Sequence, residues 1–371
     1  MILKSLSLEN FRTYSKLYLE FCKNINIIYG ENGIGKTNIL EAIYLSCITK
    51  SYRVKKDIEC LKFDENIYNL ESIFELEKKS ELESVQVYLE KNTALKKVFN
   101  NKIKVNKYTE FIGKFPVVLF SPDSMQILKG SPKERRKFID ILLSQISKKY
   151  VITLSEYKKI LEIKNTVIKQ DRKNIDLNYL DILDSKLAVC INEIVKKRDE
   201  YLKRLFDVAS YVQKSISNGA EALTYKYQTD FLNLSAQQVF ELLKNNRDID
   251  ILKKTSTKGI GHDDILVYIN GNLVNLYGSQ GQNRTAVLSM KIAELEILNE
   301  EKDIMPIILL DDVFSELDDI RIKYLLQYVS KYQAIITTTS IDTYIEDIKN
   351  LQKDVKCFKV TSNGIVKNIE L

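Results

Sequence analysis

The sequence predicts an α/β protein in which a discontinuous lobe with a mixed sheet is interrupted by an inserted, mainly helical lobe. Three observations predict this: alternating apolar and polar residues at the start, apolar strand-like runs near the end, and a lysine-rich helical stretch between them. We expect lobe I to comprise residues 1–120 plus 300–371, and lobe II to comprise 121–299. The 371 residues are enough for two lobes with buried cores.

The first thirty residues alternate as strands do, and we expect them to form one small sheet. Its last strand, 25–29, leads into a glycine-rich segment at 30–37. Residues 38–47 then predict a helix with Ile39, Leu40, Ile43 and Tyr44 on one side. Further strand-like runs follow at 85–89, 102–105 and 116–120.

The helical lobe begins with a recognisable start signal. Ser131-Pro132-Lys133-Glu134 has the pattern of a capping box, and the lysine-rich stretch that follows to about residue 215 predicts paired helices. Asn270-Gly271 predicts a hairpin turn, with alternation at Leu266, Tyr268, Leu273 and Leu276. The remaining predicted elements are a helix at 282–299, a strand at 306–310, a helix at 318–328, a strand at 334–339 and a strand pair near 357–371.

Composition excludes several classes of protein. A content of 44% hydrophobic and 29% charged residues, with 12 Gly and 4 Pro, excludes collagen-like and wholly disordered chains. The single histidine, His262, excludes a His-rich metal site, and we expect it on a surface loop. Five widely spaced cysteines without a C-x-x-C pair argue against a disulfide framework. No apolar run reaches membrane-spanning length, and Lys4 interrupts any leader, so we expect a cytoplasmic protein without a membrane partner.

Positive charge is concentrated in the helical lobe. The net charge is +6, yet residues 131–215 alone contain 19 Lys and Arg against 12 Asp and Glu. A basic lobe predicts binding to a phosphate backbone. A lysine-rich helical surface that is simply solvated is an equally good interpretation of charge taken alone.

The strongest motif is the segment Gly30-Glu31-Asn32-Gly33-Ile34-Gly35-Lys36-Thr37, which matches G-x-x-x-x-G-K-[ST]. Glycines in such a loop let backbone N–H groups close on the α- and β-phosphates of a nucleotide. Lys36 is expected to reach the β- and γ-phosphates, and the Thr37 hydroxyl is expected to ligate Mg²⁺. An ordinary glycine turn is the alternative.

A second motif ends the strand 307–310 with two carboxylates, Asp311 and Asp312. We expect Asp311 to hold Mg²⁺ and Asp312 to polarise the attacking water as the base. A core strand that ends at an acidic turn is the structural alternative.

A third motif, 278–282, stands directly before a predicted helix. Ser279 and Gln282 fit a capping box, but a helix start with a hydroxyl and a glycine, Gly281, is also an anion site. The segment resembles the signature sequence of ABC-type ATPases, in which two heads pair face to face. That resemblance implies that Ser279 and Gly281 contact the γ-phosphate held by the other subunit, and that Ser279, Gln282, Lys36 and Asp312 form the catalytic set.

Over nearly its whole length the chain resembles the RecF family of bacterial recombination and gap-repair ATPases, related to the ABC-type P-loop ATPase heads of SMC and Rad50 proteins. The segments that carry the resemblance are 10–14, 30–44, 50–53, 120–123, 129–136, 279–282 and 310–318. The resemblance implies ATP and Mg²⁺ as cofactors, with Arg12 and Asn38 added to the nucleotide contacts. It also implies a slow, DNA-stimulated ATPase that forms a homodimer on ATP.

The same resemblance implies the biological partners. It predicts binding to single-stranded and gapped double-stranded DNA, and cooperation with RecR and RecO to load RecA on gapped DNA in recombinational repair and replication restart. An ATP-binding adaptor with incidental hydrolysis is one alternative, and an ABC transporter ATPase subunit is another.

Two segments depart from familiar patterns. Where the family usually has Gly-Pro-His-Arg-Asp-Asp, residues 259–264 read Gly-Ile-Gly-His-Asp-Asp. Residues 337–339, at the position of the switch histidine of ABC transporters, are three threonines that either bond the γ-phosphate or end a strand. Arg12 and Arg53 are equally well interpreted as cations near the nucleotide and as exposed pairing arginines.

Overall fold

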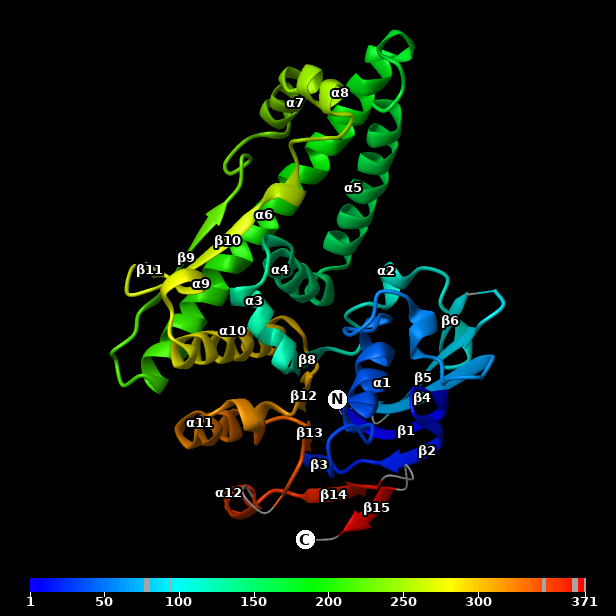
Figure 1. Cartoon of the computed structure of the whole chain (residues 1–371), viewed down its shortest axis with the longest axis vertical. Coiled ribbons are helices and arrows are strands. Elements are labelled where there is room, and N and C mark those ends of the chain that lie inside the picture. The colour runs from blue at the N-terminus through cyan, green and yellow to red at the C-terminus, as the bar shows by residue number, and fades with distance from the viewer. Residues whose placement is uncertain (77–80, 94, 342–344, 362–365, 370–371) are drawn as a thin grey trace. The chain divides into compact units, whose positions relative to one another are not determined.

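The computed structural model describes residues 1–76, 81–93, 95–341, 345–361 and 366–369 (Figure 1). The chain divides into two compact units, unit 1 with residues 1–124 and 294–371, and unit 2 with residues 125–293. The boundaries expected from the sequence, 120/121 and 299/300, lie a few residues from these breaks. Unit 1 is therefore built from both ends of the chain.

The first sheet of unit 1 is antiparallel throughout, in the order β2-β1-β4-β5-β6-β7. Alternate residues along these strands are buried, as the period-two pattern predicts. Its strands are β1 (Ile2–Phe11), β2 (Tyr14–Glu20), β4 (Ile67–Leu76), β5 (Glu81–Glu90), β6 (Lys96–Asn100) and β7 (Ile103–Lys104).

The second sheet of unit 1 is mixed, in the order β15-β14-β3-β13-β12-β8. All its neighbouring pairs are parallel except β14 with β15. Its strands are β3 (Ile25–Tyr29), β8 (Val117–Phe120), β12 (Ile307–Asp311), β13 (Ala334–Thr338), β14 (Val355–Val360) and β15 (Val366–Ile369). The expectation that 25–29 joins the first two strands in one sheet is wrong, because β3 is buried along nearly its whole length and pairs in parallel with β13 and β14.

Helix α1 (Lys36–Ile48) connects the two sheets of unit 1 through one core. Apolar side chains of α1 pack with those of β1, β4 and β5 and with those of β8 and β12. The helix is consequently buried nearly all round, including Lys36 and Glu41, and the expectation of a single apolar side is wrong. A helix covered by sheets on both sides has no solvent-exposed face, so its sequence does not show one apolar and one polar side.

Unit 2 is mainly helical, as expected, and its long helices α5 and α6 run side by side (Figure 1). The lysine-rich stretch forms α4 (Pro132–Ile146), α5 (Lys148–Val167) and α6 (Leu177–Ile216). Helix α4 begins at the predicted place with Pro132 in its first turn, but the predicted capping box is not formed. The Glu134 backbone N–H already donates to the Ser131 carbonyl at 2.9 Å. It is therefore not available to the Ser131 hydroxyl, which would accept it in a capping box.

A small antiparallel sheet in unit 2 has the order β11-β10-β9, with β9 (Leu223–Gln228), β10 (Asp264–Ile269) and β11 (Asn272–Leu273). The predicted Asn-Gly hairpin is confirmed, with Asn270 at φ 49 and Gly271 at φ 81. The predicted alternation does not continue to Leu276, because the chain turns directly into the short helix α9 (Val274–Tyr277), where Leu276 is exposed.

The remaining helices complete the two units. They are α2 (Tyr108–Phe111), α3 (Gln126–Lys129), α7 (Ala236–Asn245), α8 (Arg247–Lys253), α10 (Gln280–Glu301), α11 (Asp319–Val329) and α12 (Ile345–Lys349), with 3-10 turns at Asp57–Cys60, Pro122–Met125, Arg172–Asn174, Ile260–His262 and Val313–Glu316. Within the described ranges, no helix has both the length and the apolar content of a membrane span.

Candidate nucleotide-binding site

The glycine-rich loop connects β3 to α1, the arrangement expected of a phosphate-binding loop. Gly30 has φ +149, and a Cβ there would lie 2.5 Å from the Val360 carbonyl oxygen. Gly35 has φ +107, and a Cβ there would lie 2.6 Å from the Thr13 hydroxyl. Both positions therefore need glycine, for their left-handed backbone and for the close approach of neighbours.

The Lys36 side chain folds back onto the glycine-rich loop. Its Nζ donates to the carbonyl oxygens of Gly30 and Glu31, at 2.7 Å each. Burial lowers the pKa of Lys36, while the nearby carboxylates of Asp311 and Asp312 oppose that effect. The ammonium group is thus held inside the loop, and in loops of this kind it binds the terminal phosphates of a nucleotide.

The two residues predicted to hold magnesium lie in direct contact. Thr37 Oγ1 donates to Asp311 Oδ1 at 2.8 Å, although 274 residues separate them in sequence. A hydroxyl and a carboxylate are the hard oxygen ligands that Mg²⁺ prefers, and Mg²⁺ usually completes its shell with water and substrate phosphates. The chemistry of these two oxygen donors fits that role.

Asp311 is held by two further hydroxyl groups. Thr337 Oγ1 donates to Oδ1 at 2.9 Å, and the Tyr52 hydroxyl donates to Oδ2 at 3.1 Å. Thr337 is buried and Tyr52 is half-buried, and desolvation raises the pKa of Tyr52 well above its ordinary value, so its hydroxyl stays a donor. The carboxylate is thereby fixed in orientation before any ligand binds.

Asp312, the predicted base, follows in an unusual backbone conformation. Its φ and ψ of 50 and 30 place it in the left-handed region, which Asp tolerates better than most residues. Its backbone N–H donates to Thr337 Oγ1 at 3.0 Å. Burial raises the pKa of its carboxyl group, and Lys36 opposes that shift.

A cavity of 570 Å³ opens beside the loop, at the carboxyl ends of three parallel strands of unit 1. Its lining comes from the start of the loop, from residues 339–341 after β13, and from residues 359–361 at the end of β14. Ligands of open α/β sheets bind at this edge. The cavity borders the first part of the loop, and Lys36, Thr37 and Asp311 are not among its lining residues.

Arg12 and Arg53, the two candidate cations, both contact Glu41 of α1. Arg12 donates to Glu41 through Nε at 2.9 Å and Nη2 at 2.6 Å, while Arg53 donates to the same carboxylate at 3.3 Å and to Asn38 Oδ1 at 2.8 Å. The Glu41 side chain is fully buried, and Ser51 also donates to it at 2.5 Å. The structure therefore places both arginines in one ion cluster, and their contact with a nucleotide stays a prediction.

The signature-like segment belongs to unit 2 and forms the predicted capping box. The Ser279 N–H donates to Gln282 Oε1 at 3.0 Å, and the Gln282 N–H donates to Ser279 Oγ at 3.2 Å. Ser279 is exposed at the start of α10, whereas Gly281 and Gln282 are half-buried. The capping role is thus present, and the role toward a phosphate stays a prediction.

Comparison with known proteins decides the family. The family model described as "RecF/RecN/SMC N terminal domain" matches residues 2–363. The DNA replication and repair protein RecF of Clostridium kluyveri is 40% identical to this chain, with 100% of both chains covered, and the RecF protein of Clostridium tetani is 37% identical, covering 99% of this chain and 100% of the relative. The chain belongs to the RecF family.

Solved structures agree with this assignment. A structure described as the recombination mediator protein RecF-ATP in the RecFOR pathway has TM-score 0.89 and 34% identity, covering 100% of this chain and 98% of that chain. An Smc head domain from Pyrococcus furiosus, at 17% identity and TM-score 0.57, covers 100% of this chain and 96% of that chain and shares the fold alone. The expected ABC-type P-loop ATPase head with an inserted helical lobe is confirmed.

The segment in which this chain departs from the usual RecF pattern is firmly packed within unit 2. Asp263 is buried and accepts from Arg198 at 2.8 Å and from the Tyr227 hydroxyl at 2.7 Å. Asp264 accepts two hydrogen bonds from Arg135, at 2.6 and 2.9 Å. His262 is exposed, as expected, so the two aspartates after it have the structural role.

Sequence reasoning missed three residues around the RecF phosphate loop: Glu41, Tyr52 and Thr337. Tyr52 lies in a segment that carried the family resemblance, but nothing in a single sequence shows that its hydroxyl meets a carboxylate 259 residues away. For Thr337 a signal existed, because it stands one strand from Asp311, but the sequence indicated only a phosphate contact or a strand end. Glu41 follows Thr37 by one helical turn, yet its burial depends on the two sheets that cover α1.

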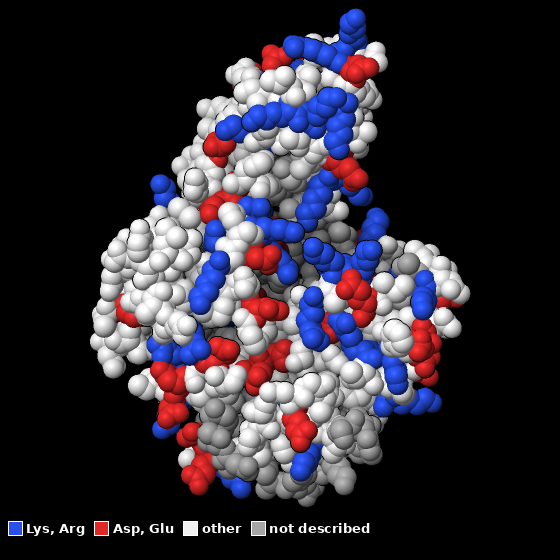
Figure 2. Space-filling view, viewed as in Figure 1, with Lys and Arg blue, Asp and Glu red and all other residues white. Residues whose placement is uncertain are grey.

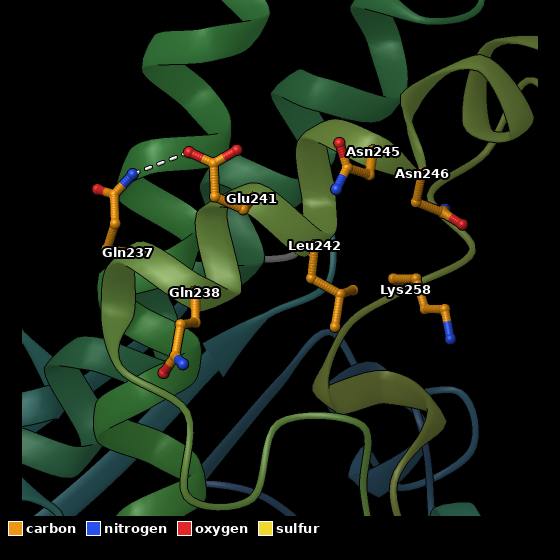
Figure 3. A pocket seen from close by; sticks show the side chains of 7 residues that line it. All are labelled: Gln237, Gln238, Glu241, Leu242, Asn245, Asn246 and Lys258. Atoms are coloured by element: carbon orange, nitrogen blue, oxygen red, sulfur yellow. Dashed lines mark hydrogen bonds between the residues drawn. The ribbon is translucent and has the colours of Figure 1, made fainter.

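A second hollow lies entirely in unit 2, between α7 and the segment that follows α8 (Figure 3). It measures 510 Å³ and is lined mainly by amide side chains, together with Leu242 and Lys258. Gln237 donates to Glu241 at 2.9 Å across one turn of α7. None of these residues belongs to a motif that the sequence singled out.

Proposed function

We propose that this protein is a slow, DNA-stimulated ATPase that dimerises on ATP and binds DNA during recombinational gap repair and replication restart. The observation that carries the nucleotide part is the 2.8 Å contact between Thr37 and Asp311, which joins the phosphate loop to the acidic strand end. Two RecF structures described with ATP or an ATP analogue, at 34% and 35% identity, support it.

Each residue of the loop has a role in this proposal. Backbone N–H groups of residues 30–38 and the Lys36 ammonium bind the phosphates of ATP. Thr37 and Asp311 hold Mg²⁺, which neutralises charge that develops on the phosphates. Asp312 orients the attacking water and accepts its proton, a task that suits a carboxyl group whose pKa burial has raised.

The other half of each site comes from a second subunit. Ser279, Gly281 and Gln282 of one subunit contact the γ-phosphate bound to the loop of its partner. An exposed hydroxyl at the start of a helix of 22 residues supports this role, since such a helix end favours anions. Monomers then turn ATP over slowly, and turnover rises with protein concentration and with DNA.

The decisive experiment compares Ser279→Arg with Ser235→Arg. Both serines are N-caps in complete capping boxes of unit 2, so each substitution removes a comparable cap. We expect Ser279→Arg alone to abolish ATP-dependent dimerisation in analytical ultracentrifugation. Wild-type protein that stays monomeric with ATP, or a Ser279→Arg variant that dimerises normally, would overturn the proposal.

A second comparison tests whether hydrolysis matters. Lys36→Arg is expected to bind ATP without turnover, and Asp312→Asn is expected to trap the ATP-bound dimer. If either variant repairs DNA normally in cells that lack the wild-type protein, an ATP-binding adaptor with incidental hydrolysis is the better description.

DNA binding is assigned to the basic surface of unit 2. Figure 2 shows Lys and Arg side chains over the part of unit 2 where Figure 1 places α5, α7 and α8, with a few Asp and Glu side chains among them. Single-stranded and gapped double-stranded DNA are the proposed ligands, and RecO and RecR are the proposed partners in loading RecA. A salt titration of DNA binding tests this, because a steep slope that appears only with ATP indicates that dimer formation assembles the phosphate contacts.

A further inference from the structure

A second basic surface lies in unit 1, away from the stretch 131–215 that the charge count singled out. Residues 91–114 contain seven lysines and a single acidic residue, Glu110. They form β6, β7 and α2 at one edge of the antiparallel sheet, where Figure 2 also shows Lys and Arg side chains. The strand β7 is the last of that sheet, so this edge has no further strand beside it.

Five of the seven lysines of this edge fall into two groups. Lys96 and Lys114 have structural partners, since Lys96 pairs with Asp57 at 2.7 Å and Lys114 pairs with Glu83 at 2.5 Å. Lys102, Lys104 and Lys107 are exposed, and no described acidic side chain lies within ion-pair distance of them. Their charge is therefore available to a ligand.

The strand register places two aromatic rings among these lysines. Tyr88 of β5 stands opposite Lys97 of β6, and Phe99 of β6 stands opposite Lys104 of β7. Directly paired residues project from the same face, and these pairs alternate with the buried pair Val87 and Val98. Tyr88, Lys97, Phe99 and Lys104 therefore share the solvent face of the sheet, which we call the lysine–aromatic face.

The rings on this face are accessible. Tyr88 and Phe99 are half-buried, and both lie on the side of the sheet opposite the core, so part of each ring is open to solvent. The Lys97 ammonium lies 5.7 Å from the centre of the Tyr88 ring, which is cation–π distance. The two rings stand diagonally across neighbouring strands, about 7–8 Å apart at their backbones, so two bases of one strand can stack side by side.

We propose that the lysine–aromatic face binds single-stranded DNA, with bases stacked on Tyr88 and Phe99 and phosphates paired with Lys97 and Lys104. Partly exposed rings flanked by cations are the arrangement that binds unpaired strands without sequence preference. Duplex DNA fits less well, because its bases are already stacked on one another and cannot reach an open sheet. This inference rests on the proposed function and adds a second DNA surface, in the other unit.

Protection of a sheet edge is the competing explanation for the lysines. Charged side chains on an edge strand prevent it from pairing with other chains. That explanation accounts for Lys104 of β7 but not for Lys97, because β6 is paired on both sides. It also gives no reason for two aromatic rings on the solvent face. Acidic neighbours are present on this face at Glu71 and Glu90, so the positive charge is confined to β6 and β7.

The test measures binding of the full chain, with ATP, to a fluorescent oligothymidylate and to a duplex of equal length. The double variant Lys97→Gln/Lys104→Gln should lower the slope of log affinity against log salt for the single strand by about 1.4, two contacts at about 0.7 each. Phe99→Thr, which keeps strand propensity, should weaken single-strand binding about tenfold and leave duplex binding unchanged.

Lys16→Gln is the matched control, because Lys16 lies on the same sheet at the opposite edge, across from Glu9. It should leave both affinities unchanged. If wild-type protein binds the single strand and neither the Lys97→Gln/Lys104→Gln variant nor the Phe99→Thr variant changes that binding, the inference is overturned. The proposed function then stays intact. Equal losses on single strand and duplex would overturn the single-strand assignment, whereas a wild-type chain that binds neither DNA would overturn both proposals.

Discussion

Thr337 Oγ1 lies 2.9 Å from Asp311 Oδ1, at the end of neighbouring parallel strands. The same oxygen accepts a hydrogen bond from the backbone N–H of Asp312 at 3.0 Å. One buried hydroxyl thus orients both acidic residues of the site. Thr337 belongs to the segment that the sequence aligns with the switch histidine of ABC transporters. In this chain its hydroxyl bonds the two aspartates at the end of β12.

Replacing Thr337 with valine tests that arrangement. The substitution keeps the shape of the side chain and removes the hydroxyl, so Asp311 loses a partner that fixes its orientation. We expect ATP turnover to fall about tenfold, and the Mg²⁺ concentration for half-maximal turnover to rise by a similar factor. Thr338→Val is the control, since the Thr338 hydroxyl donates to the Ser340 carbonyl instead. Equal effects of both substitutions would contradict the assignment.

Tyr52→Phe removes the hydroxyl that donates to Asp311 Oδ2. Because the ring stays in place against Tyr44, we expect ATP affinity to change little and turnover to fall about tenfold in a steady-state ATPase assay. Tyr68→Phe serves as the comparison, since Tyr68 is also buried in unit 1 but its hydroxyl has no described partner. The assignment would be wrong if turnover in Tyr52→Phe matched that in Tyr68→Phe.

Glu41→Gln removes the charge that two arginines share. Arg12 and Arg53 would then lose their buried anionic partner, and breaking a buried ion pair on one side costs about 3 kcal/mol. We expect the free energy of unfolding to fall by that amount in denaturant titrations. Asp248→Asn breaks the exposed pair with Arg172 and should cost less than about 1 kcal/mol. Equal costs would show that burial adds nothing to the Glu41 cluster.

Asp181 gives a prediction about pH. A hydrogen bond from Arg247, at 2.7 Å, lowers the pKa of this carboxyl group, so the folded state favours its ionised form. That contribution is complete above the ordinary Asp pKa of about 4 and is lost as pH falls through the lowered value. We expect Asp181→Asn to be less stable than wild type at pH 7 and the difference to shrink as pH falls below about 4. A difference that stayed constant with pH would contradict this cause.

Local patterns predicted most of the architecture. The phosphate loop, the acidic strand end, the Asn270-Gly271 turn and the long helices of unit 2 each have a signal within a few residues, and all lie where expected. The placement of β3 was wrong because sheet membership depends on strands more than 300 residues later in the chain. Alternation shows that a strand exists but does not identify its neighbours.

The contacts that tune the candidate site were the least predictable part. Thr37 and Asp311 follow from motifs with known spacing, whereas Tyr52, Thr337 and Glu41 act through contacts that only the folded chain creates. The failed capping box at Ser131 has a similar cause. A serine hydroxyl does not cap a helix when a backbone carbonyl already accepts the hydrogen bond from the same N–H group.

The position of β3 between β13 and β14 also sets the order of events during synthesis on the ribosome. The strand that carries the phosphate loop is made more than 300 residues before both of its partners, β13 and β14. The antiparallel sheet and the helical unit can each fold from continuous stretches as they emerge. The nucleotide pocket cannot, so a nascent chain stays unable to bind its ligand until residues 334–360 have been made and have paired with β3.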